Sequence, residues 1–284
     1  MERGPRDAVV PEPFWLDGKK GKLAAVLYRA ADVKGVLLIA PPFAEERKCS
    51  HRSLHRTAQA LARNGFSCLR LDFWGMGDSQ GAFEEADLET WVDDFCVGVD
   101  ALRALQPGVR PGALGLRLGG SLCVRALQER TLGPCVLWQP LISGRAFLEE
   151  SLKRKRIKRM MTQGKGAGAE EEVQDALFTG KVVDFDGYAV SPKMYRQLEE
   201  LDLSKEVPPS GVDLLWVQMG PSESISKTVQ EVTDRWREGE ARIEALAVRE
   251  KPFWNVIGAL EDPAGLQPTV HWLEGREGTR WKST

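Results

Sequence analysis

The stretch Gly115-Leu116-Arg117-Leu118-Gly119-Gly120 joins an apolar run, Gly112 to Leu116, to a helical pattern that extends from Leu118 to Gln128. A G-x-S-x-G sequence at such a junction forms a nucleophile elbow, a sharp strand-to-helix turn that holds its central side chain out over the sheet. The glycines flank the centre because strand and helix pack too closely there for side chains. Here both glycines are present and the centre is Arg117. On its own, the spacing also fits a simple tight turn.

A second glycine-rich stretch lies earlier in the chain. Asp72-Phe73-Trp74-Gly75-Met76-Gly77-Asp78-Ser79 follows the apolar run Ser67 to Asp72. It resembles the D-x-x-G-x-G-x-S loop after the fourth strand of α/β hydrolases. Gly75 and Gly77 allow the sharp turn, and the polar side chains tie the loop together. Together with the elbow, this loop predicts an α/β-hydrolase fold.

Short β-rich runs alternate with helical stretches along most of the chain, as in a mostly parallel, doubly wound sheet. The middle runs are continuously apolar, which is typical of strands covered by helices on both faces. The predicted strands are Leu23 to Tyr28, Gly35 to Ala40, Ser67 to Asp72, Gly112 to Leu116, Pro134 to Gln139, Asp213 to Gln218 and Arg242 to Val248. The predicted helices are Ser53 to Asn64, Leu88 to Leu105 and Leu118 to Gln128.

Residues 142–204 break this alternation and are interpreted as a helical cap inserted into a core formed by residues 1–141 and 205–284. The insertion holds the basic run Lys153 to Arg159 and a flexible stretch, Gln163 to Ala169. A basic run of this kind most often forms a solvated helix face. A lid over an anionic substrate and a weak membrane-surface contact are the alternatives.

Composition excludes several classes of protein. The 284 residues are 42% hydrophobic and carry a formal net charge of −2, so neither a disordered chain nor a nucleic-acid-binding polyelectrolyte is expected. The five cysteines form no C-x-x-C pair, and with three histidines they predict neither a metal site nor a cofactor. Unpaired cysteines favour a reducing compartment. With no apolar signal core and no run long enough to span a membrane, the sequence predicts a cytoplasmic protein.

Four stretches resemble the bacterial exosortase A system-associated hydrolase 2 family. They are Pro42 to Lys48, Gly115 to Gly119, Leu137 to Gly144 and Pro252 to Trp254, and the resemblance extends from about residue 13 to residue 275. The strings FAEE and GLRLG are the most specific. The resemblance implies a hydrolase fold and an association with exopolysaccharide and protein-sorting systems. It also implies that arginine at the elbow is a feature of the family.

A serine hydrolase needs a nucleophile, a base, an acid that orients the base, and an oxyanion hole. Arg117 at the nucleophile position has no attacking atom. The nearest hydroxyl is Ser121, one helical turn further on, which fits a helix-packing residue or a displaced nucleophile. The nearby thiol of Cys49 has no assigned base, and Cys123 is expected inside the helix.

The base and the acid are expected in loops at the carboxyl ends of the last strands. The loop from Glu250 to Asn255 has no histidine. His51 and His55, expected at the start of a helix, and His271, expected in the terminal helix, are weak alternatives. Glu223 fits the acid position, although the N-terminal region of a helix explains a glutamate equally well.

An oxyanion hole requires only backbone N–H groups in suitable positions. The candidate donors are the amide of Leu118 and that of Phe43 or Ala44. Glu45 and Glu46 in the same loop are expected either to pair with Arg117 or to face water.

Three hypotheses for the function follow. The first is a degenerate hydrolase that binds an anionic or acylated small molecule through Arg117. The second is an active ester or acyl hydrolase, or an acyl transferase, with displaced residues drawn from Ser121, Ser143, His51 and Glu45. The third is a non-catalytic partner-binding protein of an exopolysaccharide or protein-sorting pathway. The residues favour the first, with a small-molecule ligand and no nucleic acid as partner.

Overall fold

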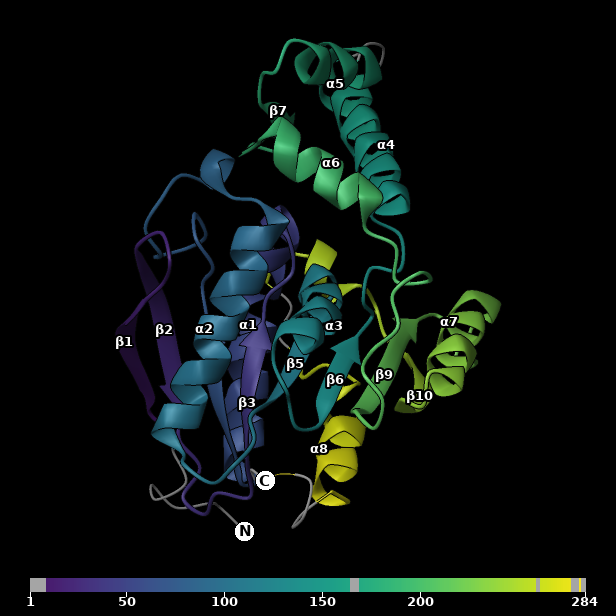
Figure 1. Ribbon diagram of the computed structural model, residues 1–284. Coiled ribbons are helices and arrows are strands. Elements are labelled where there is room, and N and C mark those ends of the chain that lie inside the picture. Colours follow the sequence, from purple (N-terminus) through teal and green to yellow (C-terminus); the bar gives the residue numbers. More distant parts are fainter. Residues whose placement is uncertain (1–8, 164–168, 259–260, 277–280, 282–284) are drawn as a thin grey trace.

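The computed structural model describes residues 9–163, 169–258, 261–276 and 281. Its centre is an eight-stranded sheet with the order β1-β2-β4-β3-β5-β6-β9-β10 (Figure 1). The strands are β1 (Pro11–Asp17), β2 (Lys22–Tyr28), β3 (Gly35–Ala40), β4 (Phe66–Leu71), β5 (Gly112–Leu116), β6 (Cys135–Trp138), β9 (Asp213–Gly220) and β10 (Arg242–Arg249). All seven predicted strands form, with ends within two residues of those expected.

The sheet is parallel from β4 to β10, and β1 and β2 add an antiparallel edge. The strand β1 was not predicted. Its residues alternate between half-buried and exposed, and Trp15 is 55% exposed. Pro11 and Pro13 also weaken a strand pattern, because proline is confined to edges of sheets. The strand therefore forms through its pairing with β2 and not through its own apolar content.

Helices cover both faces of the sheet. The side chains of α1 (Ala44–Arg63) and α8 (Leu266–Glu274) pack in one core cluster. Those of α2 (Leu88–Leu105), α3 (Leu118–Glu129) and α7 (Lys227–Glu238) pack in the other. These two layers enclose the apolar strands β3, β5 and β6, which are buried throughout.

The start of α1 differs from the prediction. The helix begins at Ala44 and not at Ser53, so Glu45 and Glu46 lie in its first turn and not in a loop, and the histidines are not at its start. Residues 44–52 are mostly polar and give no apolar periodicity. Their buried side chains, among them Glu46, Cys49 and Ser50, are small or polar, which is why the pattern missed them.

The insertion lies above the carboxyl ends of the parallel strands (Figure 1). It contains α4 (Gly144–Gln163), α5 (Ala169–Phe178), a hairpin of β7 (Val183–Phe185) and β8 (Tyr188–Val190), and α6 (Pro192–Glu200). It is thus mostly helical, with a hairpin that was not predicted. Residues 164–168 of the predicted flexible stretch lie outside the described residues. An antiparallel bridge between Ser143 and Asp202 places the entrance and the exit of the cap side by side.

Two further properties concern the described residues only. None of their helices is long and apolar enough to cross a bilayer. No group of three or more His, Cys, Asp or Glu side chains among them could hold a metal ion.

Candidate functional site

The turn between β5 and α3 has the geometry of an elbow. Arg117 has φ 55° and ψ −120°, a strained conformation for a residue with a side chain. A Cβ atom on Gly115 would lie 2.3 Å from the carbonyl oxygen of Gly119. A Cβ atom on Gly119 would lie 2.3 Å from the carbonyl oxygen of Ala40. Both glycines are therefore required for the close packing of strand and helix that the sequence predicted.

Arg117 forms an ion pair with Glu46 in the first turn of α1. Its Nη2 lies 3.2 Å from Oε1 of Glu46, and its Nε donates to both carboxylate oxygens at 3.3 Å. The two side chains are 11% and 5% exposed. A third contact joins Nη1 of Arg117 to the carbonyl oxygen of Gln139, at 3.5 Å, in the segment after β6. The elbow side chain is therefore fixed by two other segments of the core.

Two aromatic rings contact the guanidinium of Arg117. Its central carbon lies 5.3 Å from the ring centre of Trp254 and 5.9 Å from that of Phe147. Trp254 belongs to the short 3-10 helix Phe253–Asn255 after β10, and Phe147 belongs to α4 of the cap. Cation–π contacts of this kind strengthen when the cation is shielded from water. The charge of Arg117 is thus held between the core and the cap.

Burial and the charge of Arg117 shift the pKa of the Glu46 carboxyl group in opposite directions. Burial raises its pKa above the ordinary value, although the positive charge of Arg117 and its hydrogen bonds act in the opposite direction. The desolvation of the carboxylate outweighs the attraction because the side chain is almost fully buried. The buried position therefore disfavours the ionised form of Glu46.

A cavity of about 280 Å³ lies beside the pair. Its walls come from the start of α1, from the cap, and from the segment after β10. Six lining residues are aromatic or aliphatic, four are charged, and Arg117 itself is not part of the lining. The lining comprises Phe43, Ala44, Glu45, Glu46, Cys49, Phe147, Ser151, Arg154, Phe185, Asp186, Trp254, Asn255 and Ile257. Small-molecule sites combine apolar walls with polar groups that orient the ligand, and this cavity is richer than most in charged side chains.

The candidate catalytic residues other than Arg117 lie apart from this pair. Ser121 is fully buried in α3, and its hydroxyl donates to the carbonyl of Leu141 at 2.9 Å. Glu223 is exposed after β9 and faces Arg249 at 3.8 Å. The Ser121 hydroxyl also lies 3.5 Å from the backbone carbonyl oxygen of Arg117. Neither Ser121 nor Glu223 forms a hydrogen bond or ion pair with the Arg117 guanidinium that the structure shows.

The candidate oxyanion residues lie at the two helix starts. Leu118 is the first residue of α3, and Ala44, with φ 47°, is the first residue of α1. Amides at such positions have no acceptor within their own helix. Phe43 is buried and packs edge-on against Phe147. Glu45 points away from Arg117 and pairs with Lys48 at 3.3 Å.

The histidines of α1 interact with other residues. His55 Nδ1 lies 2.8 Å from the hydroxyl of Tyr28, and His51 Nδ1 lies 3.2 Å from Nη2 of Arg70. Burial, and then the charge of Arg70, lowers the pKa of both rings. His271 is exposed in α8.

The two candidate thiols are buried. The thiol of Cys49 lines the cavity, and burial raises its pKa. Cys123 is fully buried in α3, and its pKa is raised chiefly by a hydrogen bond with Cys135. A thiol with a raised pKa holds little of the thiolate that would act as a nucleophile.

Two parts of the site were missed by the sequence analysis. Phe147 carries no local signal, because its contact with the elbow depends on how the cap folds back. Trp254 lies in a stretch that the family resemblance had singled out, but no role followed from its type.

The comparisons with known proteins agree with this architecture. The Hydrolase_4 family, described as serine aminopeptidase, S33, matches residues 31–163, a segment that includes Glu46 and the elbow. No curated protein matches the chain. Est1E from Butyrivibrio proteoclasticus, solved with ferulic acid bound, is 15% identical, and its TM-score is 0.60 over 92% of this chain and 96% of that chain. The esterase Pf2001 from Pyrococcus furiosus is also 15% identical, with a TM-score of 0.60 over 98% of this chain and 96% of that chain. A third similar structure is XC6422 from Xanthomonas campestris, described as an α/β serine hydrolase without a lid. It is 16% identical, with a TM-score of 0.56 over 97% and 95% of the two chains.

The chain has the α/β-hydrolase fold. The predicted fold class is thereby confirmed.

The glycine loop after β4 belongs to the core of this fold. Asp72 forms an ion pair with Arg47 of α1 at 2.6 Å and accepts a hydrogen bond from the amide of Asp78. A Cβ atom on Gly77, at φ 53°, would overlap both members of that pair. The loop therefore ties α1 to the sheet beside the elbow.

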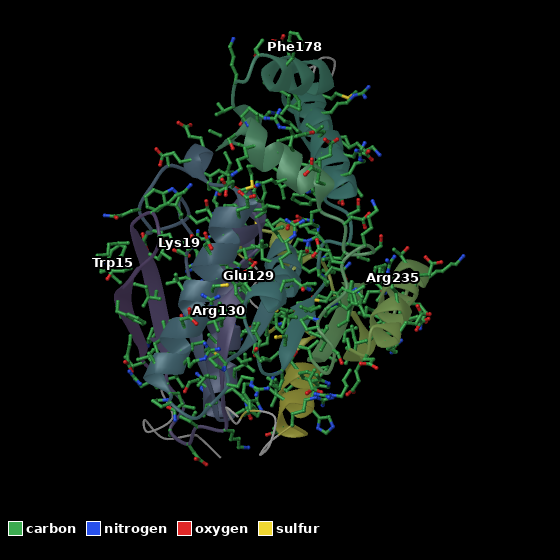
Figure 2. The ribbon with its side chains drawn as sticks, in the orientation of Figure 1. Trp15, Lys19, Glu129, Arg130, Phe178 and Arg235 are labelled. Carbon is green, nitrogen blue, oxygen red and sulfur yellow. The ribbon has the colours of Figure 1, made fainter. Side chains whose placement is uncertain are left out.

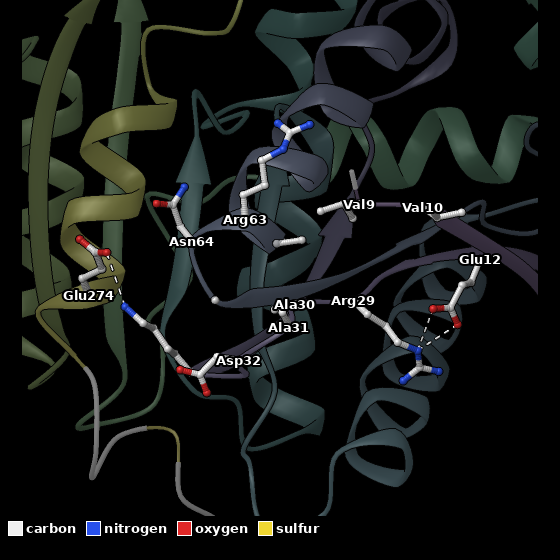
Figure 3. A pocket seen from close by; sticks show the side chains of 13 residues that line it. Val9, Val10, Glu12, Arg29, Ala30, Ala31, Asp32, Arg63, Asn64 and Glu274 are labelled. Atoms are coloured by element: carbon white, nitrogen blue, oxygen red, sulfur yellow. Dashed lines mark hydrogen bonds and ion pairs between the residues drawn. The ribbon is translucent and has the colours of Figure 1, made fainter. Parts of the chain in front are cut away.

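A larger cavity lies elsewhere in the described part of the chain. It measures about 840 Å³ and is lined at the opposite end of the sheet by the connection between β2 and β3 and by the end of α1 (Figure 3). Its charged side chains include two ion pairs, Arg29 with Glu12 at 2.9 Å and Lys34 with Glu274 at 3.7 Å. It shares no lining residue with the cavity beside Glu46.

Proposed function

We propose that this protein is an α/β-hydrolase-fold binding protein that has lost serine-type hydrolysis. In this proposal the cavity beside Glu46 takes a small anionic or acylated molecule, and Arg117 is its recognition residue. The observation that carries the proposal is the position of Arg117, at the elbow, paired with Glu46 and held between Phe147 and Trp254.

The chemistry of the elbow supports the loss of hydrolysis. A guanidinium is permanently protonated and has no lone pair with which to attack a carbonyl carbon. In a serine hydrolase the loop after the last strand would provide the base beside the nucleophile. Here that loop places Trp254 against Arg117. An indole ring accepts no proton in this pH range, so Trp254 cannot act as that base.

The cavity walls supply a second argument. Phe43, Phe147, Phe185 and Ile257 offer an apolar surface for an acyl chain or a ring. A ligand carboxylate that displaces Glu46 would gain the bidentate geometry of a guanidinium. Burial raises the pKa of Glu46 and so disfavours its charged form as the competitor of such a ligand. Est1E holds ferulic acid, an organic acid, and we propose that this cavity takes a compound of that kind.

The stretches that resemble the exosortase-associated hydrolases meet at the contacts of Arg117. Three of the four stretches that resemble the exosortase-associated hydrolases contact the elbow, through Glu46, Gln139 and Trp254, and the fourth is the elbow itself. This convergence supports a common site for the four stretches. The association with exopolysaccharide or protein-sorting systems, and with it a cytoplasmic location, is carried over from the resemblance and from the five free cysteines.

One observation favours a second candidate, an active ester or acyl hydrolase. The amides of Ala44 and Leu118 retain the helix-start positions that an oxyanion hole uses. A fluorophosphonate probe tests this alternative directly. Labelling that disappears in a single Ser→Ala variant would establish a displaced nucleophile and overturn the proposed loss of hydrolysis.

Thermal-shift titration tests the binding proposal. Ferulic acid and octanoic acid serve as anionic probes, and their ethyl esters serve as neutral counterparts. We expect the acids to raise the melting temperature of the wild type, with the effect abolished in Arg117→Ala and partly retained in Arg117→Lys. Glu46→Gln should bind the acids more tightly, because the competing carboxylate is gone. Arg235→Ala, a change of an exposed arginine on α7, is the control. Equal shifts in the wild type and Arg117→Ala would refute the role of Arg117.

A further inference from the structure

Exposed apolar side chains gather at the outer end of the cap. Ile157 and Met160 in α4 are 56% and 55% exposed, and Met161 is 83% exposed. Phe178 at the end of α5 is 91% exposed, and Figure 2 shows it at the outermost point of the cap. Large apolar side chains that are this exposed mark surfaces for interaction.

Exposed cations lie on the same helix, α4, and just after α5. Lys153 and Arg156 are exposed and lie four residues before Ile157 and Met160 respectively, so each cation shares a helix face with an apolar residue one turn further out. Among the residues that the structure describes, neither has an ion-pair partner. Lys181, three residues after Phe178, is also exposed. We call these seven residues the cap tip.

The order of these groups along α4 is informative. The helix leaves the core at Gly144 and extends outward to Gln163 (Figure 1). Lys153 is therefore nearest to the core, and Met161 lies about 12 Å further out along the helix axis. A bilayer seen from water presents anionic phosphates first and acyl chains behind them. Apolar side chains at the outer end with cations behind them match this order.

We propose that the cap tip is a docking surface for an anionic phospholipid membrane. The apolar side chains of Met160, Met161 and Phe178 enter the boundary of the acyl chains. Lys153 and Arg156 remain at the level of the phosphates, with which they form charge-assisted contacts. The contact is peripheral, and the proposal holds whether or not the cavity beside Glu46 binds a ligand.

The first experiment is co-sedimentation of the full chain with vesicles. Two kinds are compared, phosphatidylcholine alone and phosphatidylcholine with phosphatidylglycerol added. We expect binding to the anionic vesicles that weakens as salt is added, because surface charges are screened. The loss of each cation, in Lys153→Gln and in Arg156→Gln, should lower the partition coefficient about fivefold. Phe178→Ser should lower it about tenfold.

Matched variants control for unspecific effects. Trp15→Ser removes an exposed aromatic residue from the edge of the sheet, and Arg235→Gln removes an exposed cation from α7 (Figure 2). Both should bind the anionic vesicles as the wild type does. No binding to anionic vesicles, or an equal loss in the controls, would overturn the proposal. A monomer–dimer equilibrium that Phe178→Ser abolishes, without any vesicle binding, would overturn it in favour of a second copy.

A second measurement reports insertion itself. The five native cysteines are buried, so Phe178→Cys provides an accessible thiol for an environment-sensitive fluorophore. We expect its emission to shift to the blue with anionic vesicles and to stay unchanged with neutral ones. The same label on Trp15→Cys should not respond. A response of the Trp15→Cys label equal to that of Phe178→Cys would show that the cap tip is not the docking surface.

Discussion

Arg117 and Glu46 form an ion pair that joins the elbow between β5 and α3 to the first turn of α1, and both side chains are nearly buried. Arg117 occupies the central position of the elbow, where a G-x-S-x-G sequence has its serine. The two members of the pair are 71 residues apart in the sequence. Their contact therefore fixes the relative positions of two helices as well as the charge of the site.

We predict that removal of one partner destabilises the fold more than removal of both. In Glu46→Ala the guanidinium of Arg117 is left buried without a counter-charge, which should cost about 3–5 kcal/mol of unfolding free energy. The double variant Glu46→Leu with Arg117→Met should recover much of that loss. Urea denaturation measures all three proteins. If the single and the double variants lose the same stability, the two charges are not coupled.

The elbow itself should not tolerate a methyl group. Gly119→Ala places its Cβ 2.3 Å from the backbone oxygen of Ala40, an atom that cannot move without shifting β3. We expect a loss of at least about 3 kcal/mol. The matched change Gly220→Ala, at a position with no atom within 4 Å of the added carbon, should be almost neutral. Thermal unfolding of the two variants gives the comparison, and similar melting temperatures would refute the predicted close contact.

The histidines of α1 predict a dependence of stability on pH. Their pKa values are lowered in the folded state, so the unfolded chain binds more protons between the folded values and about 6.5. Stability that is fully present above that range should be lost as the pH falls through it. Denaturant titrations from neutral to mildly acidic pH measure the slope. In His51→Gln with His55→Gln the slope should become shallower, and an unchanged slope would assign it to other groups.

Hydrolysis of simple esters should be absent. We expect p-nitrophenyl acetate to react no faster with the purified protein than in buffer, because Arg117 at the centre of the elbow has no attacking atom. Ser121→Ala should leave this background unchanged, since the Ser121 hydroxyl donates to the carbonyl of Leu141 inside the fold. A rate above buffer that survives purification and disappears in Ser121→Ala would contradict this expectation.

The sequence predicted those parts of the molecule that depend on local rules. Gly115 and Gly119 mark the elbow because close packing of strand and helix excludes any larger residue there, and this requirement is visible in the residue types alone. Gly77 marks its loop because its positive φ and the adjoining Asp72–Arg47 pair exclude a side chain. The continuous apolar runs of β3 and β5 likewise show that both faces of these strands are covered.

Other parts depend on distant contacts and gave no such pattern. The first turns of α1 are buried through Glu46 and Ser50, polar residues that an apolar periodicity cannot detect. The contacts of Phe147 and Trp254 with Arg117 require the cap and the segment after β10 to meet over the elbow. The choice between Glu45 and Glu46 as the partner of Arg117 also remained open, because it depends on which helix face each occupies.

The bridge between Ser143 and Asp202 has a consequence for how such a chain can change over evolutionary time. The chain leaves the sheet and returns to it through neighbouring, hydrogen-bonded positions, with the amide of Gly144 donating to Leu201 and that of Leu203 donating to Ile142. We therefore expect that the segment between these points can be exchanged for another of similar core contacts while β6 and β9 keep their register. A recombination event there would exchange the outer surface and one wall of the cavity, Phe147 included, while Arg117 and Glu46 stayed in place.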